Sequence, residues 1–228
     1  MIHHFNADHT QEYTILNAAH VVHVYENTGH ECMEIDLTFA VAKDRRLEFT
    51  PIILGTGSYK ITLTFILEEN AEALIKGAYA LADLQKCMIN TRQYHLGKNS
   101  TSNLSINGVV TDNAFADYRG MIRIEQTAPG TCAHQENKTM LFSDTARATS
   151  IPSIEVLNHD VSCAHGSAVG PLDAEQVLYA QARGIEQIDA KKMLVRSFFA
   201  QMLDNIHQTE QKTELVLKLT HRIIGECI

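Results

Sequence analysis

Residues 153–170 read SIEVLNHDVSCAHGSAVG, a run of small and β-branched residues that predicts a β-strand. Side chains two positions apart in a strand point to the same face, so Cys163 and His165 would present a sulfur and a nitrogen to one point. These two atoms suit a soft or borderline metal ion. Residues 173–184 change to a helical pattern. We therefore expect a metal site where a β-body meets a helical end, with Cys163 and His165 as ligands.

Two ligands do not complete a metal site. Zinc takes four ligands in structural sites, and three plus a water in catalytic ones. The ordinary alternative is a buried thiol beside a hydrogen-bonded imidazole, because a free cysteine often behaves as a small buried apolar residue. Cys132 and His134 repeat the spacing in another strand-like stretch, for which coincidence is the simpler interpretation. The Cys163 and His165 pair thus needs support from the rest of the chain.

The chain from about residue 12 to residue 165 has the pattern of many short strands. Segments that alternate or are rich in β-branched residues are 21–25, 32–39, 59–66, 102–106, 120–124 and 138–142. Turn residues separate them at 27–29, 55–57, 107–108 and 129–130. A sandwich, a barrel and a β-solenoid all fit, and no exact repeat distinguishes them. The polar run 98–103 suits a β-helix corner or an ordinary loop, and residues 69–86 suit a helix or a further β-coil.

A helical part follows the strand-like part. Asp173 and Gln176 form a capping-box arrangement, which predicts a helix over 173–184. Two more helices are predicted over about 189–207 and 210–226. The first of these two carries a wide apolar stripe that predicts a core contact, with a partner-binding groove as the alternative. The stripe consists of Leu194, Val195, Phe198, Phe199, Met202, Leu203 and Ile206.

The composition excludes several classes of protein. The net charge is −8 and no basic cluster is longer than a pair, which argues against a general nucleic-acid binder. No apolar run approaches the roughly 20 residues that a membrane-spanning helix needs. The N-terminus lacks the charged and apolar regions of a signal peptide, so we expect a cytoplasmic protein. His3, His4 and His9 are expected to lie in a mobile terminus.

The cysteines are widely spaced and form no Cys-x-x-Cys pair. They are Cys32, Cys87, Cys132, Cys163 and Cys227. In a reducing compartment they would be thiols. The chain also lacks the P-loop, the dinucleotide fingerprint, the Gly-x-Ser-x-Gly elbow and the His-Glu-x-x-His motif. We therefore do not expect an enzyme.

An ordered series of short segments between about residues 108 and 203 points to one family. The segments include YRGMIRI at 118–124, QENKTMLFS at 135–143, PSIEV at 152–156, DVSCAHG at 160–166 and ARGI at 182–185. Together and in this order they resemble the core domain of the SufB/SufD family. Its members are components of the SUF iron–sulfur cluster assembly system.

The resemblance implies a fold and a set of partners. It implies a right-handed parallel β-helix over residues 1–170, followed by a helical subdomain over 171–228. It implies a non-catalytic subunit that pairs with SufB through the β-helices and binds the ATPase SufC through helices 173–228. Cys163 and His165 would support cluster formation or iron acquisition at the SufB interface. Iron or a cluster would be held transiently in the complex, and no cofactor would be tightly bound when the chain is alone.

Two positions favour the SufD branch of the family. SufB carries a cysteine nine residues before the motif histidine, where this chain has Val156. SufB also has Leu-Glu-His where this chain has Cys163, Ala164 and His165. SufD proteins are usually longer, with an N-terminal helical region and more β-coils. The chain would thus be a short member, in which residues 1–20 would cap the first coil.

Two other functions stay open at the level of sequence. One is a structural β-helix homodimer without metal, assembled through strand edges. The other is a metal-dependent or carbohydrate-active β-helix enzyme, which would want clustered charged side chains on one face and usually secretion. The chain shows neither feature clearly.

Overall fold

The computed structural model describes residues 2–29 and 31–225, so Cys227 lies outside the described residues. The strands are β1 Ile2–Phe5, β2 His9–Ile15, β3 Ala19–Asn27, β4 Met33–Val41, β5 Arg46–Gly55, β6 Tyr59–Leu67, β7 Glu72–Leu81, β8 Lys86–His95, β9 Thr101–Val110, β10 Phe115–Ile124, β11 Thr131–Leu141, β12 Arg147–Val156 and β13 Val161–Pro171. The helices are α1 Ala174–Gln181, α2 Gln187–Met202 and α3 Thr209–Ile224.

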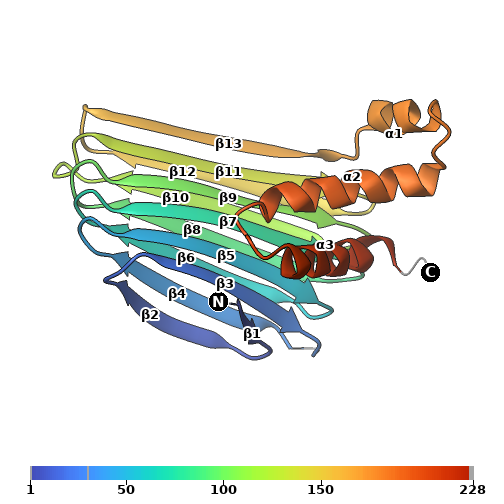
Figure 1. Ribbon diagram of the computed structural model, residues 1–228, viewed down its shortest axis with the longest axis horizontal. Coiled ribbons are helices and arrows are strands. Elements are labelled where there is room, and N and C mark those ends of the chain that lie inside the picture. Colours follow the sequence, from blue (N-terminus) through green and yellow to red (C-terminus); the bar gives the residue numbers. More distant parts are fainter. Residues whose placement is uncertain (1, 30, 226–228) are drawn as a thin grey trace.

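The strands build two stacked parallel sheets. Odd-numbered strands form a sheet of seven in the order β1-β3-β5-β7-β9-β11-β13, and even-numbered strands form a sheet of six. The chain therefore changes sheet with every strand, and two successive strands make one coil of a solenoid (Figure 1). This arrangement confirms the expected β-helix followed by helices. Of the three architectures left open by the strand pattern, the solenoid is the correct one.

The coils differ in length. Met33 on β4 pairs with Tyr59 on β6, whereas Phe115 on β10 pairs with Arg147 on β12, so the later coil is longer. Because the number of residues per coil changes along the chain, the sequence has no fixed repeat length. The absence of an exact repeat is therefore compatible with a solenoid.

Stacked aromatic rings fill the interior between the first coils. Tyr13, Phe39 and Phe65 lie in one register row on β2, β4 and β6. Their ring centroids are 4.9 Å apart between Tyr13 and Phe39 and 5.5 Å apart between Phe39 and Phe65. Full burial of the Phe39 and Phe65 rings contributes about 1.5–3 kcal/mol each to stability. This row explains the alternation that predicted strands in this part of the chain.

Asparagine and aspartate turn the corners. Asp44, Asn70 and Asn99 have φ angles of 59°, 53° and 56°, in the left-handed region that short polar side chains tolerate best after glycine. Asn70 Nδ2 donates to Asp44 Oδ1 at 2.7 Å, and Asn99 Nδ2 donates to Asn70 Oδ1 at 3.2 Å. The three side chains thus form a ladder up one corner. The interpretation of residues 98–103 as a β-helix corner is confirmed.

The turn predicted at Asn107 and Gly108 is wrong, because both residues lie inside β9. A Cβ atom at position 108 would lie 2.1 Å from Cε2 of Tyr79. Tyr79 is fully buried and its hydroxyl bonds Thr139 Oγ1 at 2.5 Å. Gly108 is therefore needed for the close approach of an aromatic ring and not for a turn.

The ambiguous residues 69–86 form a β-coil and not a helix. They contain β7, which pairs in parallel with β5 and β9. Ala73, Ala78 and Ala80 are all buried, Ala73 inside the solenoid and Ala78 and Ala80 beneath the helices. The alanine content thus reflects close packing in the solenoid.

The expectation of a mobile N-terminus is also wrong. His3 and His4 lie on β1, which pairs with β3, and His9 lies on β2, which pairs with β4. Phe5 stacks on His9 with ring centroids 4.1 Å apart, and His23 packs against both rings. Aromatic packing at this end of the solenoid holds the segment in place.

Helices α2 and α3 lie against the sheet of seven, whereas α1 packs on α2 beyond the end of β13 (Figure 1). Asp173 caps α1 by accepting the backbone N–H groups of Glu175 and Gln176, as its sequence predicts. On α2, Val195 and Phe199 are fully buried, and they share a core with Ile52 of β5 and Val109 of β9. The apolar stripe of α2 is therefore core. That helix ends at Met202, earlier than predicted, and residues 203–208 connect it to α3.

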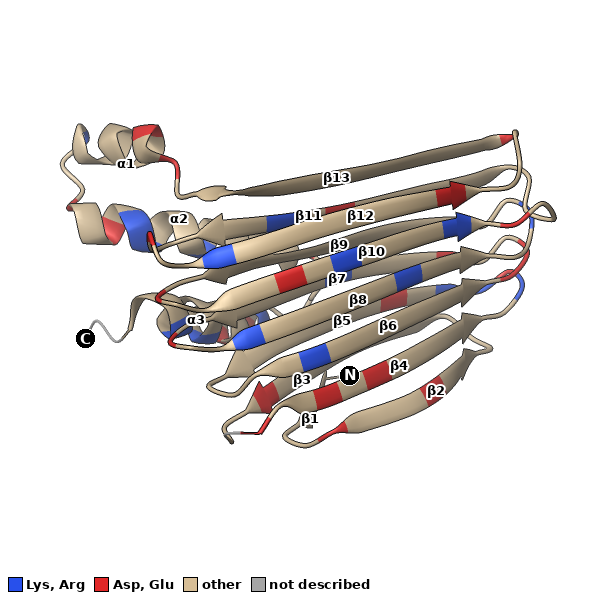
Figure 2. Cartoon of the chain, turned by 180° about the vertical axis from the view of Figure 1, so that it is seen from behind, with Lys and Arg blue, Asp and Glu red and all other residues tan. Residues whose placement is uncertain are grey.

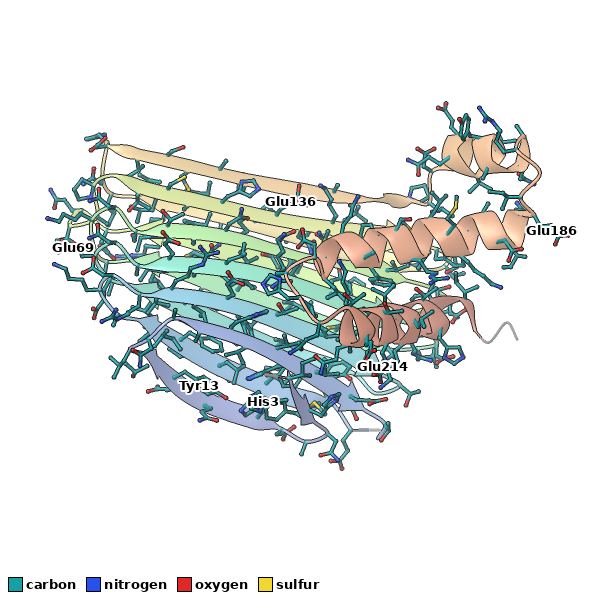
Figure 3. All side chains as sticks on the ribbon, in the orientation of Figure 1. His3, Tyr13, Glu69, Glu136, Glu186 and Glu214 are labelled. Atoms are coloured by element: carbon teal, nitrogen blue, oxygen red, sulfur yellow. The ribbon has the colours of Figure 1, made fainter. Side chains whose placement is uncertain are left out.

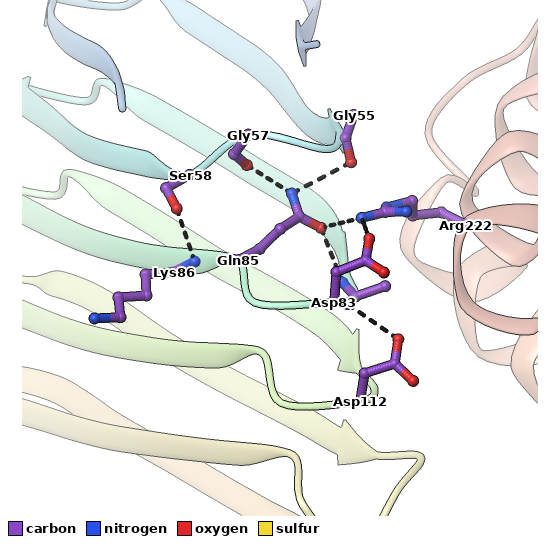
Figure 4. A network of polar contacts seen from close by, with 9 residues as sticks. Gly55, Gly57, Ser58, Asp83, Gln85, Lys86, Asp112 and Arg222 are labelled. Carbon is purple, nitrogen blue, oxygen red and sulfur yellow. Dashed lines mark hydrogen bonds and ion pairs between the residues drawn. The ribbon is translucent and has the colours of Figure 1, made fainter. Parts of the chain in front are cut away.

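A polar network fastens α3 to the solenoid (Figure 4). Arg222 Nη2 donates to Asp83 Oδ2 and to Gln85 Oε1, each at 2.7 Å. Gln85 Nε2 in turn donates to the carbonyl oxygens of Gly57 at 2.6 Å and Gly55 at 3.2 Å. One arginine therefore connects the last helix to two coils.

The sheet of six presents its outer face without helices. Charged residues of both signs are distributed along its strands (Figure 2). Lys60 pairs with Glu34 at 3.2 Å, and Arg123 pairs with Glu155 at 3.2 Å. None of the described helices has both the length and the apolar character needed to cross a membrane.

Candidate functional site

Cys163 and His165 lie on β13, the outermost strand of the sheet of seven. Their register partners on β11 are Ala133 and Gln135, which are buried between the sheets. Both predicted ligands therefore share the inner face of β13, in agreement with their spacing. Cys163 is half-buried and His165 is exposed. Their role as metal ligands stays a prediction.

The thiol of Cys163 lies in an apolar setting. It packs against a cluster that contains Ile122, Ile124 and Ala133. Burial raises the pKa of Cys163, and the neighbouring Cys132 raises it further. The thiol form is thus favoured at neutral pH, and a metal ion would have to displace the proton in order to bind the thiolate.

A short polar path lies beneath His165. Gln135 is fully buried below it, and Gln93 Nε2 donates to Gln135 Oε1 at 3.2 Å across the space between the sheets. Nε2 of Gln135 has no hydrogen-bond partner among the described residues. A Cβ atom at Gly120 would lie 2.0 Å from that nitrogen, so glycine makes room for the amide. Sequence reasoning missed these glutamines, although they occupy inner positions of otherwise alternating strands.

The terminal coil, which consists of β12 and β13, forms the free edge of both sheets. Five large apolar side chains are exposed on it or on the turn after β12: Ile151, Ile154, Val156, Leu157 and Val169. Val156 pairs with the buried Ile124 and therefore faces inward, yet it is 42% exposed because no further coil covers it. The outer backbone edge has no strand partner in the described chain. Such an edge suits pairing with another solenoid.

Cys163 and His165 do not form a complete ligand set by themselves. Within residues 2–29 and 31–225, they belong to no group of three or more histidine, cysteine or acidic side chains close enough to hold one ion. A metal at this place would need ligands from a second chain. The geometry fits a site divided between two molecules.

The repeated spacing at Cys132 and His134 leads to a different face. Cys132 pairs with Ser162 and is exposed, whereas its neighbour Ala133 is buried with Cys163. Cys132 therefore points outward from the sheet, away from the inner face that carries Cys163. The structure does not bring the two Cys-x-His pairs together on one face.

Comparisons with known proteins identify the family of the chain. A family model described as "SUF system FeS cluster assembly, SufBD core domain" matches residues 4–198. Iron–sulfur cluster assembly protein SufD of Escherichia coli is 31% identical over 117 residues, which cover 51% of this chain and 28% of that protein. SufD of Bacillus subtilis is 28% identical over 176 residues, which cover 77% of this chain and 37% of that protein.

A SufBD family protein of Mycobacterium tuberculosis is 26% identical over 192 residues, which cover 80% of this chain and 48% of that protein. The matched regions thus span less than half of the length of each of these three relatives. The family model extends the likeness well before residue 108, where the sequence motifs were faint.

Proposed function

The chain belongs to the SufBD family of the SUF iron–sulfur cluster assembly system, and from this premise we propose that it acts as a non-catalytic, SufD-type subunit of an assembly complex. In this proposal, the terminal coil pairs with the β-helix of a SufB partner. Cys163 and His165 then contribute a sulfur and a nitrogen to iron acquisition or cluster formation at the interface. The iron or the nascent cluster is cargo of the complex and is held transiently.

One observation carries the proposal. The free edge of the solenoid combines an exposed apolar surface with the side chains of Cys163 and His165, which are suited to soft or borderline metal ions. No third ligand lies close to both in the described chain. An apolar edge alone would fit any strand pairing. Iron–sulfur clusters require several thiolate ligands, with histidine as an occasional replacement. A ligand set that becomes complete only when two chains pair would therefore link pairing at this edge to metal binding.

The proposal assigns the SufD role because of position 156. Val156 stands where SufB has a cysteine, and it faces inward on the terminal coil. An apolar side chain there cannot supply a thiolate. The chain would then depend on its partner for the remaining sulfur ligands.

The proposal places SufC on the helices. Leu178 and Tyr179 on α1 are each 64% exposed, and Met193 on α2 is 45% exposed. These side chains lie outside the core that the helices share with the sheet. They offer apolar contacts to a partner, and an ATPase partner would supply the P-loop that this sequence does not contain. The four described cysteines are free thiols, which suits the cytoplasmic setting that we propose.

The test is co-expression with the SufB and SufC of the same organism, followed by anaerobic purification through a tag on this chain alone. We expect both partners to co-purify with the wild-type chain. Cys163→Ala and His165→Ala should reduce the iron and sulfide content of the complex by about tenfold or more while assembly is retained. Cys32→Ala is the matched control, because Cys32 is also a free thiol but lies before β4, remote from the terminal coil.

A second variant separates pairing from metal chemistry. Val169→Lys places a charge on the exposed inner face of β13 and should abolish recovery of SufB. If SufB and SufC fail to co-purify with the wild-type chain, the proposed complex is wrong. A stable, metal-free dimer of the chain would then support a structural homodimer assembled through the same edge.

A further inference from the structure

A group of side chains of the types that ligate metals lies far from the terminal coil, near the start of the solenoid. His20 on β3 and Glu48 on β5 are register partners on adjacent parallel strands. Their sequence neighbours Val21 and Leu47 pack against the inner core, so His20 and Glu48 point to the outer face of the sheet of seven. This is the face that the helices cover.

The connection between α2 and α3 brings a third side chain to the same place. Asn205 Nδ2 donates to Thr50 Oγ1 at 2.6 Å, and Ile206 is buried in the core beneath the helices. Lys76 Nζ also pairs with Asp204 at 2.6 Å. Residues 204–206 are thus anchored on β5 and β7, which places His207 over His20 and Glu48.

The three side chains have the geometry of a binding site. One ligand atom from each of His20, Glu48 and His207 lies within 4.8 Å of the others. The imidazole rings of His20 and His207 are nearly perpendicular, with centroids 5.7 Å apart. Nε2 of His20 is buried and has no hydrogen-bond partner among the described residues. A buried, unpaired ring nitrogen is costly unless another atom binds it.

A charged neighbour orients the carboxylate of this group. Burial lowers the pKa of His20, an effect that Glu48 opposes. Arg46 Nη2 holds Glu48 Oε1 at 2.7 Å. The arginine orients the carboxylate, as outer-shell partners of metal ligands commonly do.

We propose that His20, Glu48 and His207 form a binding site for a divalent first-row transition metal ion such as zinc. Two imidazoles and one carboxylate with a remaining position for water form a donor set found in zinc and non-haem iron(II) sites. Two ligands come from the solenoid and one from the α2–α3 connection. The bound ion therefore ties the helices to the first coils.

Metal binding to the purified, chelator-treated full chain tests the proposal. Equilibrium dialysis against zinc should show one high-affinity ion per chain, and cobalt(II) should give a spectrum without thiolate-to-metal charge transfer. His207→Ala and Glu48→Gln should each weaken binding at least tenfold. His207 is exposed, so its replacement is not expected to disturb the fold.

Two controls distinguish this site from the terminal coil. His159→Ala removes an exposed histidine elsewhere and should leave the affinity unchanged. The double variant Cys163→Ala/His165→Ala should also retain the ion. Zinc should further slow amide hydrogen exchange in residues 203–208 of the wild type, and not in His207→Ala.

The proposal is overturned if the wild-type chain binds no zinc under these conditions. It is equally overturned if binding survives both His207→Ala and Glu48→Gln, or if it is lost only in the double variant. The outcome is independent of whether SufB and SufC co-purify, so failure of this site and failure of the proposed function are distinguishable.

Discussion

The central coils and the terminal coil share one architecture but differ in what covers them. Phe39 and Phe65, on β4 and β6, are buried by a layer on either side. Ile154, on β12 of the terminal coil, follows Ile122 in the same register row but has a layer on one side only and is 36% exposed. The same kind of inward-facing residue is thus core in one coil and surface in the other.

The row of inner side chains also changes in chemistry along the stack. Phe65 on β6 pairs with Gln93 on β8, so an aromatic ladder gives way to an amide. His3 and Tyr13 lie at the aromatic end of the molecule, whereas Glu136, an outward-facing residue of β11, lies at the other end close to β13 (Figure 3). Polar groups inside a solenoid cost stability unless they are paired. The Gln93 amide meets this need in part by donating a hydrogen bond to Gln135 Oε1.

Truncation of one inward-facing side chain in the central coils and one in the terminal coil should give the largest difference in the free energy of unfolding. Phe65→Ala removes a fully buried ring from the stack and should lower the free energy of unfolding by about 3–5 kcal/mol. Ile154→Ala should cost about 1 kcal/mol or less, because its side chain is already partly in water. Urea denaturation measures both values. Equal losses would show that the terminal coil is as well packed as the centre.

Acid should destabilise the covered coils through two buried histidines. Burial lowers the pKa of His23 to about 3, an effect strengthened by His9 and His3, and it lowers the pKa of His95 to about 4. Below the ordinary pKa of about 6.5, the unfolded chain takes up protons that the folded chain does not. Stability is therefore complete above that pH and falls as the pH drops toward the folded values.

The expected slope is about 1.4 kcal/mol per pH unit for each of the two histidines. Denaturation at a series of pH values from neutral to mildly acidic gives this slope. His95→Gln should remove the part of the slope that is due to His95. The hydroxyl oxygens of Ser100 and Ser102 lie 2.8 Å from the ring nitrogens of His95, and the glutamine amide should still form hydrogen bonds with them. An unchanged slope in this variant would contradict the assignment.

Two glycine substitutions, one in a central coil and one in the terminal coil, should show the same difference in stability with a smaller magnitude. Gly108→Ala places a methyl group against the buried Tyr79 ring and should cost about 1–3 kcal/mol. Gly170→Ala on the terminal coil meets nothing within 4 Å and should change stability by about 0.5 kcal/mol or less. Thermal denaturation is sufficient to rank the two. The comparison fails if Gly170→Ala is the more damaging change.

The rate of thiol alkylation should differ between the central coils and the terminal coil, and this comparison requires no substitution. Cys87 is fully buried in the central core, and burial strongly raises its pKa, so it should resist alkylation in the folded chain. Exposed Cys132 should react at least about tenfold faster, with Cys163 between them. Mass spectrometry after a short pulse of iodoacetamide gives the order. In a complex with SufB, Cys163 alone should become protected if the terminal coil is the interface.

Local sequence patterns determined much of this protein. Alternation marked many of the strands, Asp173 marked the start of the helical part, and the two-residue spacing placed Cys163 and His165 on one face. An ordered series of short motifs was enough to identify the family. These features depend on residues that are close in the sequence, where strand and helix periodicity act directly.

Only the tertiary structure decided which distant residues meet. Coils of unequal length hid the repeat, so the pairing of Gln135 with His165 and the role of Gly108 beside Tyr79 were not accessible from periodicity. His20, Glu48 and His207 meet because parallel strands align two of them and a helix connection returns the third. The register between strands is set by hydrogen bonds and packing between residues about one coil apart in the sequence. A pattern within a few neighbouring residues therefore does not predict it.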